Sequence, residues 1–115
     1  MQTRTDWLAV VRNAHIVIRN WRRAVDRVGL TPGRAAVLLA ISRADRPPKN
    51  NEIATATGAS AATVSGVLFE LTRAGLVEQL SDPFDRRTRR CILTKSGNTV
   101  VQRLQEALTG EEPRA

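Results

Sequence analysis

The densest group of chemically active residues is a basic run after the middle of the chain. Four arginines fall within five positions there, in the sequence Asp82-Pro83-Phe84-Asp85-Arg86-Arg87-Thr88-Arg89-Arg90. Positive charge concentrated in one short segment favours a polyanionic partner, either nucleic acid or an acidic membrane surface. For the charges alone, a solvated basic loop is the alternative. Asp82-Pro83 is typical of a turn, which places the arginines in a loop.

The spacing of two of these residues predicts one ordered arginine. Asp85 and Arg87 lie two positions apart, and in an extended segment their side chains point to the same side. The Asp85 carboxylate is then expected to orient the Arg87 guanidinium. An arginine held in this way, flanked by Arg86, Arg89 and Arg90, suits a narrow DNA minor groove, where the negative potential is strongest.

Two short helices joined by a tight turn are predicted directly upstream. The first begins near Asn50 or Asn51, both good capping residues, and ends at Gly58, while Ser60 caps the second helix over 61–74. In a helix-turn-helix, the N-terminal residues of the second helix face base edges in the DNA major groove. With its cap, the exposed surface of this helix is built from small residues: Ser60, Ala61, Ala62, Thr63, Ser65 and Gly66.

Such small residues make few base-specific contacts, because they lack the paired donors and acceptors of arginine or asparagine. They allow the helix backbone to approach DNA closely, to donate to phosphates and to touch thymine methyl groups. Gly66 costs a helix about 1 kcal/mol relative to alanine. Close approach to DNA explains that residue, and tight packing inside the protein explains it equally well.

The remaining segments predict one mainly α domain with a small β-hairpin (α+β). Thr31 is expected to cap a short core helix, and Thr94 is expected to cap a last helix. Strands are expected over 76–81 and 89–93, with Cys91 facing the core. We expect helices within 1–29 and 95–109 to dimerise, 30–94 to form the DNA-binding core, and 110–115 to be a frayed tail.

The first helix carries an apolar stripe in steps of four and three, close to a heptad. A partner helix from a second subunit is expected to cover this stripe, although packing wholly inside one domain is the alternative. The residues assigned to the dimer interface are Trp7, Val11, Ala14, Ile18, Trp21, Leu104 and Leu108.

Composition narrows the class of protein. The chain has 115 residues and 18 basic against 11 acidic side chains, a net charge of +7, which favours nucleic acid or an acidic membrane surface as partner. A lone cysteine, no signal peptide and no apolar run long enough for a bilayer indicate a cytoplasmic protein without a membrane partner. One histidine and one cysteine match no catalytic or metal-binding spacing, so we expect neither an enzyme nor a cofactor.

Several motifs together resemble the MarR-type winged helix-turn-helix transcriptional regulators. They are Asn51-Glu52-Ile53-Ala54, Ser60-Ala61-Ala62-Thr63-Val64-Ser65, Gly75-Leu76-Val77-Glu78, Asp82-Pro83-Phe84-Asp85-Arg86-Arg87 and Leu93-Thr94-Lys95-Ser96-Gly97. The resemblance implies a homodimer on a pseudopalindromic operator of double-stranded DNA, usually a repressor released by a small ligand or an oxidant. It also implies that Thr63, Ser65 and Gly66 lie in the major groove, and Arg87, oriented by Asp85, in the minor groove.

The chain departs from this family in three places. It ends soon after Leu108, so much of the family's dimer interface is expected to be missing or rebuilt. Gln79 and Phe84 occupy positions where the family tends to carry charge. The family's ligand pocket lies between the dimerisation and DNA-binding parts, but no residue here, His15 included, identifies an inducer. A winged helix used as a protein-interaction module is the alternative function, which the small residues of the recognition helix and the short C-terminus both permit.

Overall fold

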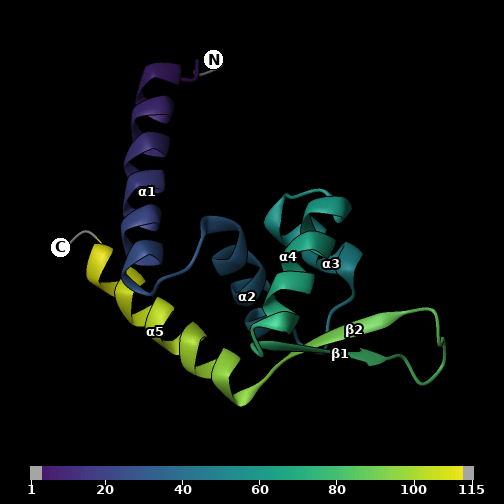
Figure 1. The fold of residues 1–115 in the computed structure, drawn as a ribbon. Coiled ribbons are helices and arrows are strands. Elements are labelled where there is room, and N and C mark those ends of the chain that lie inside the picture. Colours follow the sequence, from purple (N-terminus) through teal and green to yellow (C-terminus); the bar gives the residue numbers. More distant parts are fainter. Residues whose placement is uncertain (1–3, 113–115) are drawn as a thin grey trace.

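The computed structural model describes residues 4–112, which form five helices and one two-stranded antiparallel sheet (Figure 1). This architecture is the expected mainly helical fold with a hairpin. The elements in chain order are α1 (Trp7–Arg27), α2 (Pro32–Arg43), α3 (Asn50–Thr57), α4 (Ala61–Arg73), β1 (Val77–Ser81), β2 (Arg89–Leu93) and α5 (Lys95–Glu111).

Side-chain caps start most of the helices where the sequence predicts them. The Thr31 hydroxyl accepts a hydrogen bond from the Arg34 N–H, and the hydroxyls of Ser60 and Thr94 do the same at the starts of α4 and α5. Gly58, in the left-handed region with φ 77°, ends α3. Because this conformation strains residues that have a Cβ, a glycine at this position lets the chain make the short α3–α4 turn without strain.

The predicted asparagine cap of α3 is wrong. The residue before the helix is Lys49, and its backbone N–H donates to the Glu52 carboxylate at 2.9 Å. Asn50 is already inside the first turn, so its amide is not needed at the cap and reaches across to α4 instead. The Glu52 carboxylate therefore accepts from a backbone N–H at the start of α3, where an asparagine side chain was expected to be the acceptor.

The main core fills the space between α2, α3, α4 and the hairpin. Its fully buried side chains include Leu38, Ile53, Val64, Leu71 and Cys91. Cys91 thus faces inward, as the strand alternation predicted. This core fixes α4 against the hairpin, and so fixes the relative positions of the two elements predicted to contact DNA.

A second core cluster lies where the C-terminal half of α1 meets α2 and α5. Val25, Ala35 and Leu104 are fully buried in it, and Trp21 and Leu108 pack against it. The assignment of Leu104 to the dimer interface was therefore wrong, because the chain's own helices already bury that side chain. The sequence stripe runs continuously through a buried half and an exposed half of α1, and spacing alone does not separate the two.

The N-terminal half of α1 projects beyond the rest of the domain (Figure 1). Its stripe residues Trp7, Val11, Ala14 and Ile18 are exposed, as is Val17 beside them, with 69% of the Trp7 surface and 65% of the Val17 surface open to solvent. Leu8, Val10 and Ile16 are exposed as well, so this half of α1 is uncovered on more than one side, and its apolar stripe is the surface that a partner is expected to cover.

The last helix continues further than expected. It runs to Glu111, whereas the frayed tail is predicted to begin at Gly110. The Glu111 carboxylate pairs with Arg27 of α1 at 2.7 Å, and this contact holds the last turn of the helix. The final residues of that predicted tail, 113–115, lie outside the described residues. Across 4–112, every helix is too short or too polar to span a membrane.

Candidate nucleic-acid interface

The N-terminus of α4 carries an ordered pair of hydroxyl groups. Ser60 Oγ accepts from the Thr63 backbone N–H at 3.1 Å, and the two hydroxyl oxygens lie 2.9 Å apart. Ala61 and Ala62 between them are exposed. The residues predicted to face DNA thus form one open surface at the positive end of the helix dipole, which attracts anions.

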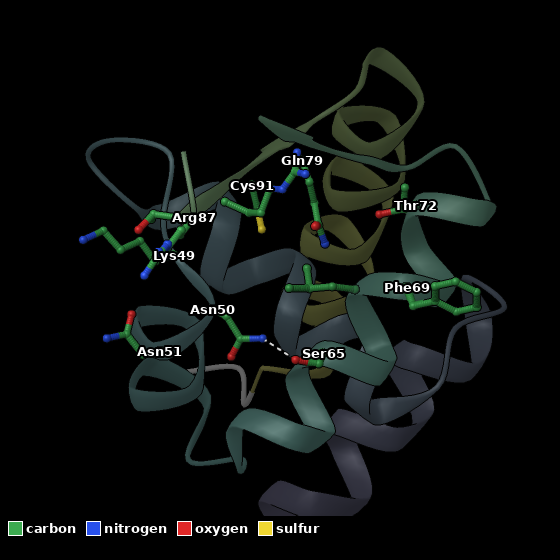
Figure 2. A pocket seen from close by; sticks show the side chains of 12 residues that line it. Lys49, Asn50, Asn51, Ser65, Phe69, Thr72, Gln79, Arg87 and Cys91 are labelled. Atoms are coloured by element: carbon green, nitrogen blue, oxygen red, sulfur yellow. Dashed lines mark hydrogen bonds between the residues drawn. The ribbon is translucent and has the colours of Figure 1, made fainter. Parts of the chain in front are cut away.

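Ser65, one helical turn further along α4, is connected to α3. Asn50 Nδ2 donates to Ser65 Oγ at 2.7 Å, as Figure 2 shows. The Ser65 hydroxyl therefore keeps its own hydrogen available for a partner while its position is fixed. Sequence reasoning missed this function of Asn50, which was expected to cap α3.

Gly66 has free space around it. A Cβ added at this position would meet no atom within 4 Å. Tight packing inside the protein, one of the two explanations for this glycine, is thereby excluded for the described residues. Close approach to DNA stays the prediction for this glycine.

The wing, residues 82–88 between β1 and β2, positions Asp85 differently from the prediction. Its carboxylate accepts hydrogen bonds from the Arg87 backbone N–H at 3.0 Å and from the Thr88 hydroxyl at 2.9 Å. The segment is a turn rather than an extended strand, since the Thr88 N–H donates to the Asp85 carbonyl. Aspartate favours the first position of such turns. Asp85 thus orients the backbone at Arg87, whereas the guanidinium was expected to be held.

A buried ion pair closes the base of the wing. Asp82 is 8% exposed, and its carboxylate accepts from Arg90 Nε at 2.8 Å and from the Phe84 N–H at 2.8 Å. These contacts, the hydrogen bond from Phe84 foremost, lower the pKa of Asp82 below its ordinary value. Sequence reasoning missed Asp82 as a structural residue, although its position just before a turn and opposite the basic strand was a signal.

The assignment of Arg90 to DNA contact is corrected by the same geometry. Its guanidinium also donates to the Pro47 carbonyl at 2.9 Å and lies 3.8 Å from the Glu52 carboxylate. The Lys49 N–H hydrogen bond, and then Arg46 and Arg90, lower the pKa of Glu52. Arg90 therefore ties the wing to the α2–α3 connector, because internal acceptors surround its charge.

Three arginines on the wing and at the start of β2 keep exposed side chains: Arg86, Arg87 and Arg89. Arg89 Nη1 donates weakly to Ser81 Oγ at 3.3 Å, which leaves its other donors open. The cationic surface of the wing is thus narrower than the sequence predicted, and it is concentrated on the loop and its exit.

A cleft of about 830 Å³ separates α4 from the wing (Figure 2). Buried Cys91 forms part of its floor, and burial raises the pKa of that thiol, which keeps it protonated and unreactive. The polar and cationic residues lining the cleft are Lys49, Asn50, Asn51, Ser65, Thr72, Gln79, Arg87, Thr88 and Arg89. Sequence reasoning missed Lys49, Asn51 and Gln79, which only the fold brings beside the arginines.

A second groove, of about 610 Å³, lies between the end of α1, α2 and α3. Trp21, Leu39 and Ile53 supply apolar wall. Charges of both signs line the groove: Arg43 and Arg46 are basic, Asp45 and Glu52 are acidic, and Arg46 lies 4.0 Å from Glu52. This groove is separate from the cleft beside the wing, and it connects the helix predicted to dimerise with the helix-turn-helix.

Comparison with solved structures identifies the same fold in several transcription regulators. The repressor CouR bound to a 23-mer DNA duplex is 26% identical, with a TM-score of 0.78 over 96% of this chain and 82% of its own. CouR from Rhodococcus jostii RHA1 bound to p-coumaroyl-CoA is 21% identical, with a TM-score of 0.80 over 90% of this chain and 72% of its own. A mutant of S. aureus MepR bound to an oligodeoxyribonucleotide is 20% identical, with a TM-score of 0.71 over 95% and 79%.

A search of curated proteins finds no match. The MarR family model matches residues 28–88, just over half of the chain. The matched segment contains α2, α3, α4, β1 and the wing. The chain belongs to the MarR family, whose members are winged helix-turn-helix, DNA-binding transcriptional regulators and not enzymes.

Proposed function

We propose that this regulator is a homodimeric repressor of a pseudopalindromic operator. The first turns of α4 would enter the major groove, and Arg87 on the wing would enter the adjacent minor groove. The observation that carries this proposal is the pairing of an open, small-residue surface on α4 with the exposed arginines of the wing.

The cleft beside the wing has a natural occupant in this arrangement. If α4 lies in the major groove and the wing in the minor groove, the sugar-phosphate strand between the grooves must cross the cleft. Lys49, Asn51 and Arg89 line it and offer cationic and amide donors to phosphate oxygens. These residues would position the duplex without reading its sequence.

The exposed half of α1 supports a dimer. Trp7, Val11, Ala14 and Ile18 form one apolar stripe whose side chains stay exposed in the described chain. Packing the same stripe of a second copy against it would remove this surface from water, at roughly 25 cal/mol per Å². A two-fold dimer would place two α4 helices about one turn of DNA apart.

Selection of bound duplexes from a random DNA pool tests the proposal. The expected result is a two-fold symmetric consensus with half-sites about one helical turn apart. Its affinity should fall with salt, with a log-log slope of about −0.9 per phosphate contact. A winged helix used only for protein interaction would return no consensus. Reporter repression from the selected site then separates repressor from activator.

We also propose that the groove beside Trp21 binds a small effector. Its apolar wall suits an aromatic or aliphatic body. Arg43 is in no ion pair among the described residues, whereas Arg46 lies 4.0 Å from Glu52, so Arg43 is the cation that would pair with a carboxylate of the effector. Thermal-shift screening with aryl and acyl carboxylates tests this, with Ala40→Phe as the variant that fills the groove. Equal shifts for the variant and the unmodified protein would contradict this site.

A further inference from the structure

Phe84 presents an unusual side chain at the tip of the wing. With 98% of its surface open to solvent, it is the most exposed large apolar residue among residues 4–112. It follows Pro83, beyond the last strand pair, Ser81 with Arg89. The other phenylalanine, Phe69, has a partner, since the Arg73 guanidinium lies 5.8 Å from its ring centre. A ring left in water can gain hydrophobic free energy only by contact with another surface.

The loop holds this ring in a defined place. The Phe84 N–H donates to the Asp82 carboxylate at 2.8 Å, and the Asp82 N–H donates to the Thr88 carbonyl at 2.9 Å. Asp82 is itself fixed by Arg90. The exposed ring is therefore carried on a braced loop, so little conformational entropy of the backbone remains to be lost on contact.

The charges around the ring indicate the chemistry of its partner. Arg86, Arg87 and Arg89 are all exposed on the same loop and strand start. The partner must therefore combine strong negative charge with an apolar face that accepts a phenyl ring. The DNA minor groove does so, because stacked base pairs line it and phosphates flank it. Phenylalanine is among the side chains that insert between base steps from this groove.

We infer that Phe84 is a wedge that inserts partly between two base pairs, beside Arg87, and kinks the duplex. This inference rests on the proposed function and adds a specificity mechanism to it. Pyrimidine–purine steps unstack most readily, so a TA or CA/TG step should be preferred under the wing. Discrimination between DNA sequences would then come from DNA deformability, because the small residues of α4 supply few base-specific donors.

The test measures bending and binding separately. The probe is the duplex recovered by the selection above, with a fluorophore at each end and 2-aminopurine at the step under the wing. The unmodified protein should shorten the end-to-end distance, corresponding to a bend of roughly 20–90°, and raise the 2-aminopurine fluorescence. Phe84→Ala should bind the duplex more weakly and lose both signals, and Phe84→Leu, which keeps an apolar wedge, should retain them.

Five outcomes separate the possibilities. Equal bending and equal step preference for Phe84→Ala and the unmodified protein would overturn the wedge while leaving the proposed DNA binding intact. Failure of the unmodified protein to bind any duplex would overturn both. If Phe84→Ala abolishes binding, restoration by Phe84→Leu supports the wedge and a null result for that variant overturns it. A fall in sedimentation mass of Phe84→Ala without DNA would assign the ring to a contact between copies, and would also overturn the wedge.

Discussion

Asp82 and Arg90 lie on either side of the wing and join its two ends, with the carboxylate accepting from Nε at 2.8 Å. Replacement of Asp82 by asparagine should lower Tm and increase protease cleavage within 83–88. A partly buried guanidinium that loses its nearest carboxylate, and keeps only Glu52 at 3.8 Å, is costly to hold in place. The matched variant Asp85→Asn, at an exposed carboxylate, should have a smaller effect on Tm.

The same pair predicts an acid-sensitive wing. The pKa of Asp82 is lowered in the folded protein by the Phe84 N–H and by Arg90, so the unfolded state binds the proton more readily. The stabilisation is fully present above the unfolded value of about 3.9 and is lost as the pH falls through the lower folded value. Glu52 contributes in the same direction. Thermal melts from pH 7 to pH 3 should therefore show an acid loss that is smaller in Asp82→Asn; parallel curves would contradict this.

Arg87 and Arg90 should differ in what their loss does. Arg87→Ala is expected to leave Tm unchanged and to cost about 1–3 kcal/mol of specific DNA affinity, because its side chain is exposed. Arg90→Ala should lower Tm as well, since its guanidinium contacts Asp82 and Pro47. Fluorescence anisotropy on the selected duplex measures the affinities, with Arg103→Ala on α5 as the control for net charge. Unchanged binding by Arg87→Ala would rule out the minor-groove assignment.

Local patterns predicted more of this molecule than pairings distant in sequence. Thr31, Ser60 and Thr94 were identified as caps because a cap depends on residues three positions away. The hairpin followed from its turn and the alternation around Cys91. The caps depend on contacts within three residues, and the hairpin joins two strands that are neighbours in the sequence, so in both cases the local pattern carries the information.

The features that sequence reasoning missed all join separate elements. The local sequence predicts Asn50 as a cap because asparagine favours that position, but its side-chain amide donates to Ser65 of α4 instead. Arg90 was grouped with its neighbours because charge alone does not reveal that Asp82, Pro47 and Glu52 surround it. Leu104 was placed at a dimer interface because a stripe does not say which helix covers it.

Gly66 provides a test in which stability and DNA binding move in opposite directions. Gly66→Ala should stabilise the fold by up to about 1 kcal/mol, since alanine favours helix and the added Cβ meets nothing. The same methyl group should weaken duplex binding if DNA approaches this surface closely. Gly97→Ala is the contrast, because its Cβ would overlap the Leu76 carbonyl oxygen and should destabilise the protein. Unchanged DNA affinity in Gly66→Ala would remove the close-approach explanation.

The proposed dimer is best tested on the exposed half of α1, away from Trp21, which packs against the second core cluster. Ile18→Glu puts a charge into the exposed stripe and should shift the protein to monomer in sedimentation, with Tm of the monomer fold largely kept. Ile16 is similarly exposed, at 43% against 48% for Ile18, but two residues are separated by about 200° around a helix. Ile16→Glu should therefore leave the mass unchanged. Equal masses for Ile18→Glu and the unmodified protein would exclude this stripe, whereas monomers from both variants would indicate a broader interface around α1.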